Sequence, residues 1–513
     1  MQPIRLMSGF FTVGLWTLAS RVLGFVRDVM IAAYLGTGPV AEAFLVAFSL
    51  PNMFRRFFAE GAFNMAFVPM FSKKLEGEEG ALNFARDAFS GMVALLLAVT
   101  LIAQVAMPWL VLAMASGFLG DERFELAVFY GRIAFPYILF ISLAALLSGV
   151  LNATGRFMAA AAAPVLLNIL FIAVMVLADI QGWPVGDALV WAVPVAGIAQ
   201  MALVWMAAAR AGYPLKLRRP RLTPELKRLA VIAAPAALAG GVVQVNLLIG
   251  RQVASFFDGA VAWLSYADRL YQLPLGVIGI AVGVVLLPDL SRRLRAEDTQ
   301  GSRDAFNRAG EVSLALTIPA ALALVTIPMP LVEVLFQRGA FDADDTAATA
   351  LAVAVYGLGL PAFVIQKIVQ PLYFAREDTK TPFYYALWAL AVNAGLAIGL
   401  APSIGYIAAA IGTTVAGWTM AGMLWVGSRR MGEAAQLDTR FRRRIWRIVI
   451  ASLAMAVVLW GGALALGPML GLPTWRYLGL AILVALGILS YFGIGQMIGA
   501  FRLSEFRRNL RGG

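Results

Sequence analysis

Long apolar runs recur from one end of this 513-residue sequence to the other, and they constrain the fold more than any other feature. A helix of about 20 apolar residues is long enough to cross the hydrocarbon core of a bilayer. Hydrophobic residues make up 61% of the chain and charged residues 14%, whereas an average soluble protein has about half and a quarter. A β-barrel would show short alternating strands in place of these unbroken runs. The sequence therefore predicts an all-α polytopic membrane protein.

The apolar runs predict fourteen transmembrane helices. We place them at 8–36, 40–70, 88–116, 124–151, 157–179, 187–209, 229–250, 260–289, 309–336, 347–374, 382–401, 404–427, 445–467 and 474–501. Loops rich in Lys and Arg alternate with loops that carry at most one basic residue. Because basic residues mark cytoplasmic loops, we predict that both termini are cytoplasmic. The N-terminal run is interpreted as an uncleaved first helix, since no small-residue cleavage site ends it before Arg21.

The two halves of the chain contain a faint duplication. The segment VPMFSKKL at 68–75 matches LPDLSRRL at 287–294. A second match keeps the spacing between a proline and an asparagine: Pro136 with Asn168, and Pro361 with Asn393. We therefore predict two six-helix lobes repeated in parallel orientation, which is a transporter architecture with its substrate site between the halves. The predicted domains are an N-terminal lobe, a C-terminal lobe and a pair of additional helices: 1–217, 218–440 and 441–513.

Several kinds of chemistry are absent from the sequence. It contains no cysteine and no histidine, which excludes thiol chemistry, imidazole bases, disulfides and zinc sites of the common kinds. It also lacks the GxxxxGK[ST] phosphate loop of nucleotide hydrolases. The net charge of +12 is explained by basic cytoplasmic loops without a nucleic-acid partner. We predict a transporter that is not an enzyme, without cofactor or metal, driven by an ion gradient, the membrane potential or the substrate gradient.

Charged residues interrupt several of the predicted spans. The first contains SRVLGFVRDVM at 20–30, although a charge at the bilayer centre costs at least about 2.5–3.5 kcal/mol. At 100° per residue, Arg21 and Asp28 share a helix face while Arg27 points elsewhere, so an internal ion pair is one interpretation. The second span, around the kink predicted at Pro51, and later helices carry further charged or polar groups: Glu42, Asn52, Arg55, Arg56, Glu60, Arg251, Asp268, Arg269 and Lys367.

Arginines outnumber the carboxylates available to them in the first, second and eighth helices. A water-filled cavity or an anionic ligand would supply the missing solvation. Guanidinium groups match phosphate oxygens in bidentate geometry, so the residues favour a phosphate or diphosphate group without identifying its carrier.

Four segments carry a family resemblance: SRVLGFVRD, LPNMFRRFFAEGAFNMAFVP, FPYILFISLAALLSGVLNATGRF and YADRLYQLPLGVIGIAVGVVLLP. They closely resemble the MurJ (MviN) family of lipid II flippases, within the multidrug/oligosaccharidyl-lipid/polysaccharide exporter superfamily, and the resemblance covers essentially the whole chain. It implies two six-helix lobes that form a V around a central cavity, plus two helices with a lipid-tail groove at 445–501. It also implies movement of lipid II, an undecaprenyl-diphosphate-linked peptidoglycan precursor, from the cytoplasmic to the periplasmic leaflet of the bacterial inner membrane.

The resemblance assigns roles to charged residues of the predicted cavity. The cations that the family needs correspond to Arg21, Arg27, Arg55 and Arg269, and their acidic partners to Asp28, Glu42 and Glu60. Glu42 stands where aspartate is common, and Gln272 stands where some relatives have an acid. We add Asn52, Arg251 and Asp268 to the candidate substrate-binding residues.

The predicted mechanism is alternating access, in which the lobes rock about the cavity while the lipid tail stays in the bilayer. Membrane lipids and the cell-wall synthesis machinery are the candidate partners. Three alternatives remain open at this level: an exporter of drugs or other lipid-linked oligosaccharides, an enzyme acting on polyprenyl phosphates, and a scaffold. Drug exporters favour carboxylates in the cavity, such enzymes favour acidic or histidine clusters, and a scaffold does not explain arginines at membrane depth.

Overall fold

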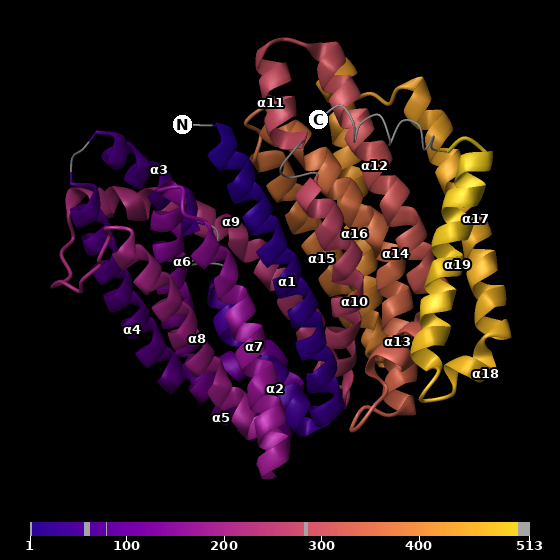
Figure 1. Ribbon diagram of the computed structural model, residues 1–513, viewed down its shortest axis with the longest axis horizontal. Helices are drawn as coiled ribbons and strands as arrows, with labels where there is room; N and C mark the ends of the chain where they lie inside the picture. The colour runs from indigo at the N-terminus through magenta and orange to yellow at the C-terminus, as the bar shows by residue number, and fades with distance from the viewer. Residues whose placement is uncertain (1–2, 56–61, 78–79, 282–285, 501–513) are drawn as a thin grey trace. The chain divides into compact units, whose positions relative to one another are not determined.

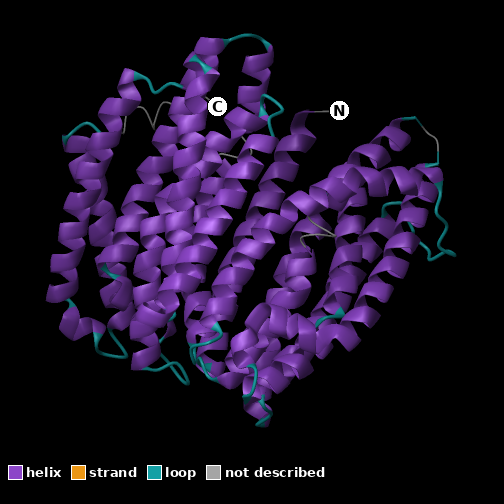
Figure 2. Ribbon diagram, turned by 180° about the vertical axis from the view of Figure 1, so that it is seen from behind, coloured by secondary structure: helices purple, strands orange, loops and turns teal. Residues whose placement is uncertain are grey.

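The computed structural model describes residues 3–55, 62–77, 80–281 and 286–500. Within these ranges every regular element is a helix (Figure 2). Ten helical stretches of the described chain are long and apolar enough to cross a membrane. The count of fourteen transmembrane helices stays a prediction, and the all-α membrane fold is confirmed.

The helices fall into two compact units. Unit 1 contains residues 1–262 together with 338–341, and unit 2 contains residues 263–337 and 342–513. The helices of unit 1 are α1 (Pro3–Leu35), α2 (Pro39–Arg55), α3 (Ala62–Glu76), α4 (Ala81–Ala115), η2 (Ser116–Phe118), α5 (Glu122–Ala134), α6 (Tyr137–Ala153), α7 (Met158–Gln181), α8 (Val185–Arg210) and α9 (Pro224–Ala254) (Figure 1).

Unit 2 contains most of α10 (Ala260–Ala281) and all later helices. These are α11 (Leu287–Arg295), α12 (Thr299–Thr326), α13 (Pro328–Phe336), α14 (Ala343–Phe374), α15 (Lys380–Ile404), α16 (Ile407–Ser428), η4 (Arg429–Met431), η5 (Glu433–Ala435), α17 (Thr439–Ala465), α18 (Gly467–Leu470) and α19 (Arg476–Met497). Helix α9 packs on α3 and α4 and is grouped with unit 1, whereas α17 packs on α12 and is grouped with unit 2. The predicted lobe boundary at 217/218 was drawn from the internal sequence repeat, whereas the two units are divided at 262/263 by packing. The boundary between the repeats therefore stays a prediction.

Proline divides two of the predicted spans. The predicted helix at 124–151 ends at Ala134 and resumes at Tyr137, on either side of Pro136, and the helix at 309–336 is broken before Pro328. Proline has no backbone N–H to donate, and its ring opposes continuation of the preceding turn. Pro361 nevertheless lies inside the continuous α14, so proline alone does not decide where a helix ends.

Polar caps begin several of these helices at the ends of the apolar runs. Asp121, Thr223, Asp298 and Asp438 each accept a hydrogen bond from a backbone N–H in the first turn of α5, α9, α12 and α17. Such a cap satisfies one of the N–H groups that have no partner within the helix, which is worth about 1 kcal/mol. These helix starts follow from local sequence.

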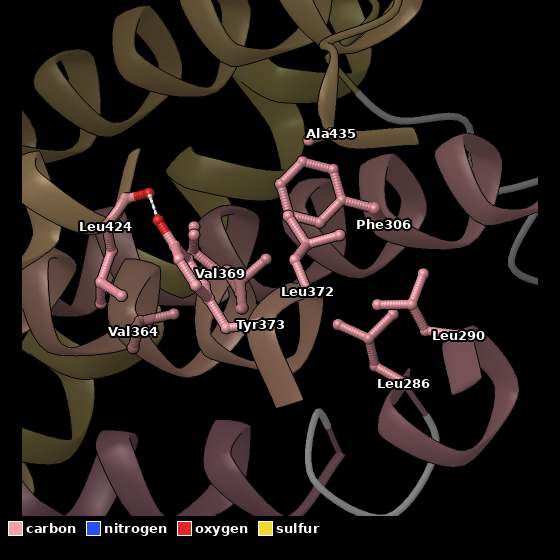
Figure 3. Packing of buried hydrophobic residues seen from close by; sticks show 10 residues of the cluster. Leu286, Leu290, Phe306, Val364, Val369, Leu372, Tyr373, Leu424 and Ala435 are labelled. Carbon is pink, nitrogen blue, oxygen red and sulfur yellow. Dashed lines mark hydrogen bonds between the residues drawn. The ribbon is translucent and has the colours of Figure 1, made fainter. Parts of the chain in front are cut away.

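The interior of unit 2 is a packed aliphatic and aromatic cluster. Figure 3 shows Phe306 of α12 and Leu372 of α14 beside Leu290 of α11, all almost completely buried. The Tyr373 hydroxyl of α14 donates to the Leu424 carbonyl of α16 at 2.7 Å. Lipid tails are as apolar as leucine, so close packing and interhelical hydrogen bonds stabilise such contacts more than the hydrophobic effect does.

Candidate functional site

Arg27 of α1 is buried and has its own carboxylate. Its Nε and Nη2 donate to the Asp28 Oδ1 at 3.0 and 2.7 Å, and its Nη1 donates to the Asn168 Oδ1 of α7 at 2.9 Å. The guanidinium carbon lies 5.8 Å from the centroid of the Phe171 ring. The charge of Arg27 is therefore compensated, because this guanidinium belongs to a neutral, hydrogen-bonded pair with Asp28.

Asn168 fixes the orientation of that pair. Its Nδ2 donates to the Ser20 carbonyl at 2.9 Å, which leaves its Oδ1 facing Arg27. The amide packs against Gly24, where an added Cβ would lie in ordinary contact, 3.5 Å from the Asn168 Nδ2. The sequence marked Asn168 through the internal repeat only. An amide inside the apolar run LLNIL was the available signal for a role at a helix interface.

Arg21 lies near the middle of α1 and differs from Arg27. It is half-buried, and it forms no hydrogen bond or ion pair with any residue in the described part of the chain. It precedes the end of α1 by 14 residues, which is about 21 Å along the helix. The ion pair at this helix joins Arg27 and Asp28, whereas angular spacing alone had placed Arg21 on the face of Asp28. The cationic surplus on α1 is therefore Arg21.

Glu42, in the first turn of α2, is 1% exposed and is held by a residue that the sequence analysis did not select. Its Oε2 accepts a hydrogen bond from the Arg123 Nη1 of α5 at 2.9 Å, and its Oε1 accepts one from the Val261 backbone N–H at 3.0 Å. These contacts place Glu42 in a network at the start of α5. It therefore does not pair with the arginines of α1 in this structure.

Arg123 is shared by three carboxylates. Besides Glu42, it contacts the Asp121 Oδ2 at 2.6 Å and the Asp258 Oδ1 at 3.0 Å, and its guanidinium carbon lies 4.6 Å from the Phe118 ring centroid. Asp121 and Asp258 are 40% and 96% exposed, so water solvates both. Burial raises the pKa of Asp121, but hydrogen bonds from the Arg123 guanidinium and backbone outweigh that effect and hold the pKa below its usual value. No spacing rule links Arg123 to Glu42, which lies 81 residues earlier.

The remaining candidates of unit 1 occupy different settings. The Asn52 Nδ2 donates to the Phe48 carbonyl of its own helix at 2.8 Å, next to Pro51. Arg55 is half-buried at the end of α2, and Arg251 is half-buried in the last turn of α9. The predicted partners Arg56 and Glu60 lie outside the described residues.

Two candidates lie on α10 in unit 2. Asp268 accepts a hydrogen bond from the side-chain amide of Gln272, one turn later. Gln272, which the resemblance places where some relatives have an acid, is therefore a hydrogen-bond donor to Asp268. Arg269, between them in sequence, is exposed. Among the described residues, no cluster of three or more histidine, cysteine, aspartate or glutamate side chains is placed to hold a metal ion.

The geometry of α1 can bind an anion. A guanidinium has five N–H donors, and the three hydrogen bonds described above leave two of those of Arg27 available. Arg21 brings a full positive charge about 9 Å along the same helix.

Comparison with known proteins gives consistent results. The family model described as lipid II flippase MurJ matches residues 31–486. A probable lipid II flippase MurJ of Rhizobium meliloti (strain 1021) is 46% identical, over 99% of this chain and 97% of its own length. The lipid II flippase MurJ of Burkholderia cenocepacia is 36% identical, over 99% of this chain and 100% of its own length.

Solved structures agree with the sequence matches. A structure described as lipid II flippase MurJ in an inward closed conformation aligns with a TM-score of 0.79 and 26% identity, covering 97% of this chain and 99% of the other. An inward-facing multidrug transporter of the MATE family aligns with a TM-score of 0.70 and 17% identity, over 81% of this chain and 95% of the other, and shares the fold. The chain belongs to the lipid II flippase MurJ family.

Proposed function

We propose that this protein is a lipid II flippase that moves the lipid-linked peptidoglycan precursor from the cytoplasmic to the periplasmic leaflet by alternating access. The observation that carries the proposal is the charge arrangement of α1. Arg21 is without a protein partner in the described part of the chain, and it lies near the middle of a 33-residue helix beside the fixed Arg27–Asp28 pair. Curated relatives of nearly equal length carry the same function in their names.

A cation in this position needs water or an anion. Placing a charged side chain at the bilayer centre costs at least about 2.5–3.5 kcal/mol, so Arg21 requires a hydrated cavity, and a diphosphate would bind there with charge-assisted hydrogen bonds. Arg27 is preorganised by Asp28 and Asn168 and offers its two remaining donors to the same group. In this scheme Arg21 supplies the net charge and Arg27 supplies orientation.

Arg55 and Arg269 complete the proposed cationic set, with Asp28 and Glu60 as acidic partners. The structure assigns Glu42 a different immediate partner, Arg123. We therefore propose that Glu42 acts on transport by holding the start of α2. Asn52, Arg251 and Asp268 stay candidates for contact with the sugar or peptide.

The polyprenyl tail is proposed to remain in the bilayer along residues 445–501. One face of α17 supports this assignment, because large apolar side chains are 51–69% exposed along its length: Trp446, Ile450, Leu453, Val457, Trp460 and Leu464. We further propose an inner-membrane location with both termini cytoplasmic, and enzymes that make or use lipid II as partners.

The test replaces the arginines in cells depleted of their own flippase. Arg21→Ala and Arg27→Ala should abolish growth, and Arg21→Lys should retain part of it, because lysine keeps the charge but loses the planar fork. Arg132→Ala is the matched control, since Arg132 is an exposed arginine whose side chain hydrogen-bonds only the Gln104 carbonyl in the described chain. Membrane insertion of each variant is checked by its abundance in membranes.

A binding measurement on the purified protein separates the charge from other effects. Loss of charge-assisted hydrogen bonds worth about 1.5–3 kcal/mol should weaken binding of lipid II about tenfold to a hundredfold in Arg21→Ala. Binding of a neutral polyprenol should stay unchanged. Growth supported by both alanine variants at normal abundance, or equal affinity for lipid II and polyprenol, would overturn the proposal.

A further inference from the structure

An irregular segment connects α8 and α9 in unit 1. Residues Tyr213–Thr223, which we call the strap, read YPLKLRRPRLT and contain no helix (Figure 1, left edge). The strap follows the end of α8 at Arg210 and precedes the start of α9 at Pro224. It therefore lies outside both flanking helices, at the end of unit 1 that the charge pattern predicts to be cytoplasmic.

The first half of the strap is held against the helices. Leu215 is 2% exposed, and its carbonyl accepts a hydrogen bond from the Trp205 Nε1 at 3.2 Å. The Arg86 Nε donates to the Pro214 carbonyl at 3.1 Å, and the Arg218 backbone N–H donates to the Ser90 Oγ at 2.9 Å. These contacts fix the backbone on α8 and α4, so the direction of the other side chains is determined by the fold.

The side chains that remain point away from the protein. Leu217 and Leu222 are 65% and 76% exposed, although neither belongs to a spanning helix. Lys216, Arg219 and Arg221 are exposed, and their side chains form no hydrogen bond or ion pair within the described part of the chain. Single exposed leucines are common on protein surfaces, but here two of them alternate with three free cations within seven residues.

A second basic segment shows that basic residues outside the spanning helices can pair with acids of the protein. At 429–444, in unit 2, Arg440 and Arg444 contact the buried Glu311 of α12. The backbone carbonyls of Gln436 and Leu437 in that segment accept hydrogen bonds from Arg303. Two of the six arginines of this segment are therefore paired with an acid of unit 2, whereas Lys216, Arg219 and Arg221 of the strap pair with no acid in the described part of the chain.

We propose that the strap is a binding site for anionic phospholipids of the adjacent leaflet. Leu217 and Leu222 enter the boundary between head groups and acyl chains, and Lys216, Arg219 and Arg221 bind lipid phosphates. Basic residues beside apolar side chains are the combination that binds anionic membrane surfaces. Each cation near such a surface raises the affinity about fivefold. The two leucines favour a lipid over a nucleic acid, because a nucleic acid would leave them in water.

The experiment titrates phosphatidylglycerol or phosphatidylcholine into the detergent-purified full chain and counts bound lipids by native mass spectrometry. One variant is Lys216→Gln/Arg219→Gln/Arg221→Gln, and a second is Leu217→Ser/Leu222→Ser. A third removes the same charge elsewhere: Arg429→Gln/Arg430→Gln/Arg443→Gln. All three residues of this control are exposed. Unfolding temperatures confirm that each variant is folded.

We expect the wild type to bind phosphatidylglycerol more tightly than phosphatidylcholine. The strap triple variant should lose this preference, by up to about a hundredfold, and the leucine variant should weaken it several-fold, while the control triple keeps it. Inorganic phosphate should compete only weakly, because it has no acyl chain. Equal loss in both triple variants, full retention in the leucine variant, complete competition by phosphate, or no preference in the wild type would each overturn the proposal. The result does not depend on lipid II transport.

Discussion

Two buried carboxylates, Glu42 in unit 1 and Glu311 in unit 2, lie in networks of opposite charge balance. Around Glu42, the single guanidinium of Arg123 is shared by three carboxylates. Around Glu311, one carboxylate contacts three guanidiniums, those of Arg308, Arg440 and Arg444. Burial of the central acid is similar, with side chains 1% and 8% exposed, so the difference lies in the surrounding groups.

The comparison shows that in each network the excess charge lies on side chains that water reaches. In unit 1 both members of the central pair are buried, and the surplus charge lies on exposed aspartates. In unit 2 the surplus charge lies on arginines that are 17–48% exposed. The basic network belongs to the end predicted to be cytoplasmic and the acidic one to the opposite end, as the distribution of basic residues in membrane proteins favours.

The largest effect is expected from Arg123→Ala. It leaves the carboxylate of Glu42 buried without its cation, and removal of one member of a buried pair costs about 3–5 kcal/mol. The free energy of unfolding in detergent should fall by that amount. The double variant Glu42→Gln/Arg123→Met, which removes both charges, should recover part of it. If Arg123→Ala unfolds like the exposed control Arg132→Ala, the pair does not stabilise unit 1.

A smaller effect is expected from Glu311→Gln. Its arginine partners are partly hydrated, so we expect a loss of about 1–3 kcal/mol in the free energy of unfolding. Part of that loss is repulsion among the remaining cations, which 1 M NaCl screens. The destabilisation of Glu311→Gln should therefore shrink in salt, whereas that of Arg123→Ala should not. Equal salt dependence of the two variants would contradict the distinction between a dry and a hydrated network.

The smallest effect concerns Asp121, at the exposed edge of the unit 1 network. Because the pKa of this carboxyl is lowered in the folded protein, its contribution to stability is present at neutral pH. That contribution is lost as the pH falls below about 3.9, the usual aspartate value, and through the folded pKa. Asp121→Asn keeps a capping acceptor but no charge, and it should cost about 0.5–1 kcal/mol after solvent screening. The difference in the free energy of unfolding between the two proteins should be largest near neutral pH and should shrink as the pH falls below about 3.9. A difference that does not change with pH would show that the charge is not involved.

Local sequence explains most of the helical architecture. The apolar runs lie within helical stretches of the described chain, and aspartate or threonine caps begin five of these helices. The break at Pro136 was not anticipated, since hydropathy is the same on both sides of it. Pro361, at the matching position of the repeat, lies inside a continuous helix, so the presence of proline alone does not predict the break.

The candidate site was predictable in its residue types and less so in its pairs. Helical spacing placed Asp28 on the face of Arg21, yet the carboxylate of Asp28 pairs with the adjacent Arg27. The two Cβ atoms of adjacent residues point about 100° apart around the helix, but the long arginine side chain spans that angle and reaches the carboxylate. Asn168 and Arg123 complete their pairs from other helices, 141 and 81 residues away along the chain. Neither distance has a local sequence signature.

The sequence by itself determined that the chain is a bundle of membrane-length helices, that it carries arginines at membrane depth, and which family it resembles. These properties depend on side-chain transfer energies and on residue order, which are local. Only the tertiary structure decided that Asn168 holds the Arg27–Asp28 pair, that Arg21 meets no partner in the described part of the chain, and that Glu42 is paired with Arg123. Whether a charge is compensated depends on which helices lie against one another, and hydropathy does not encode that arrangement.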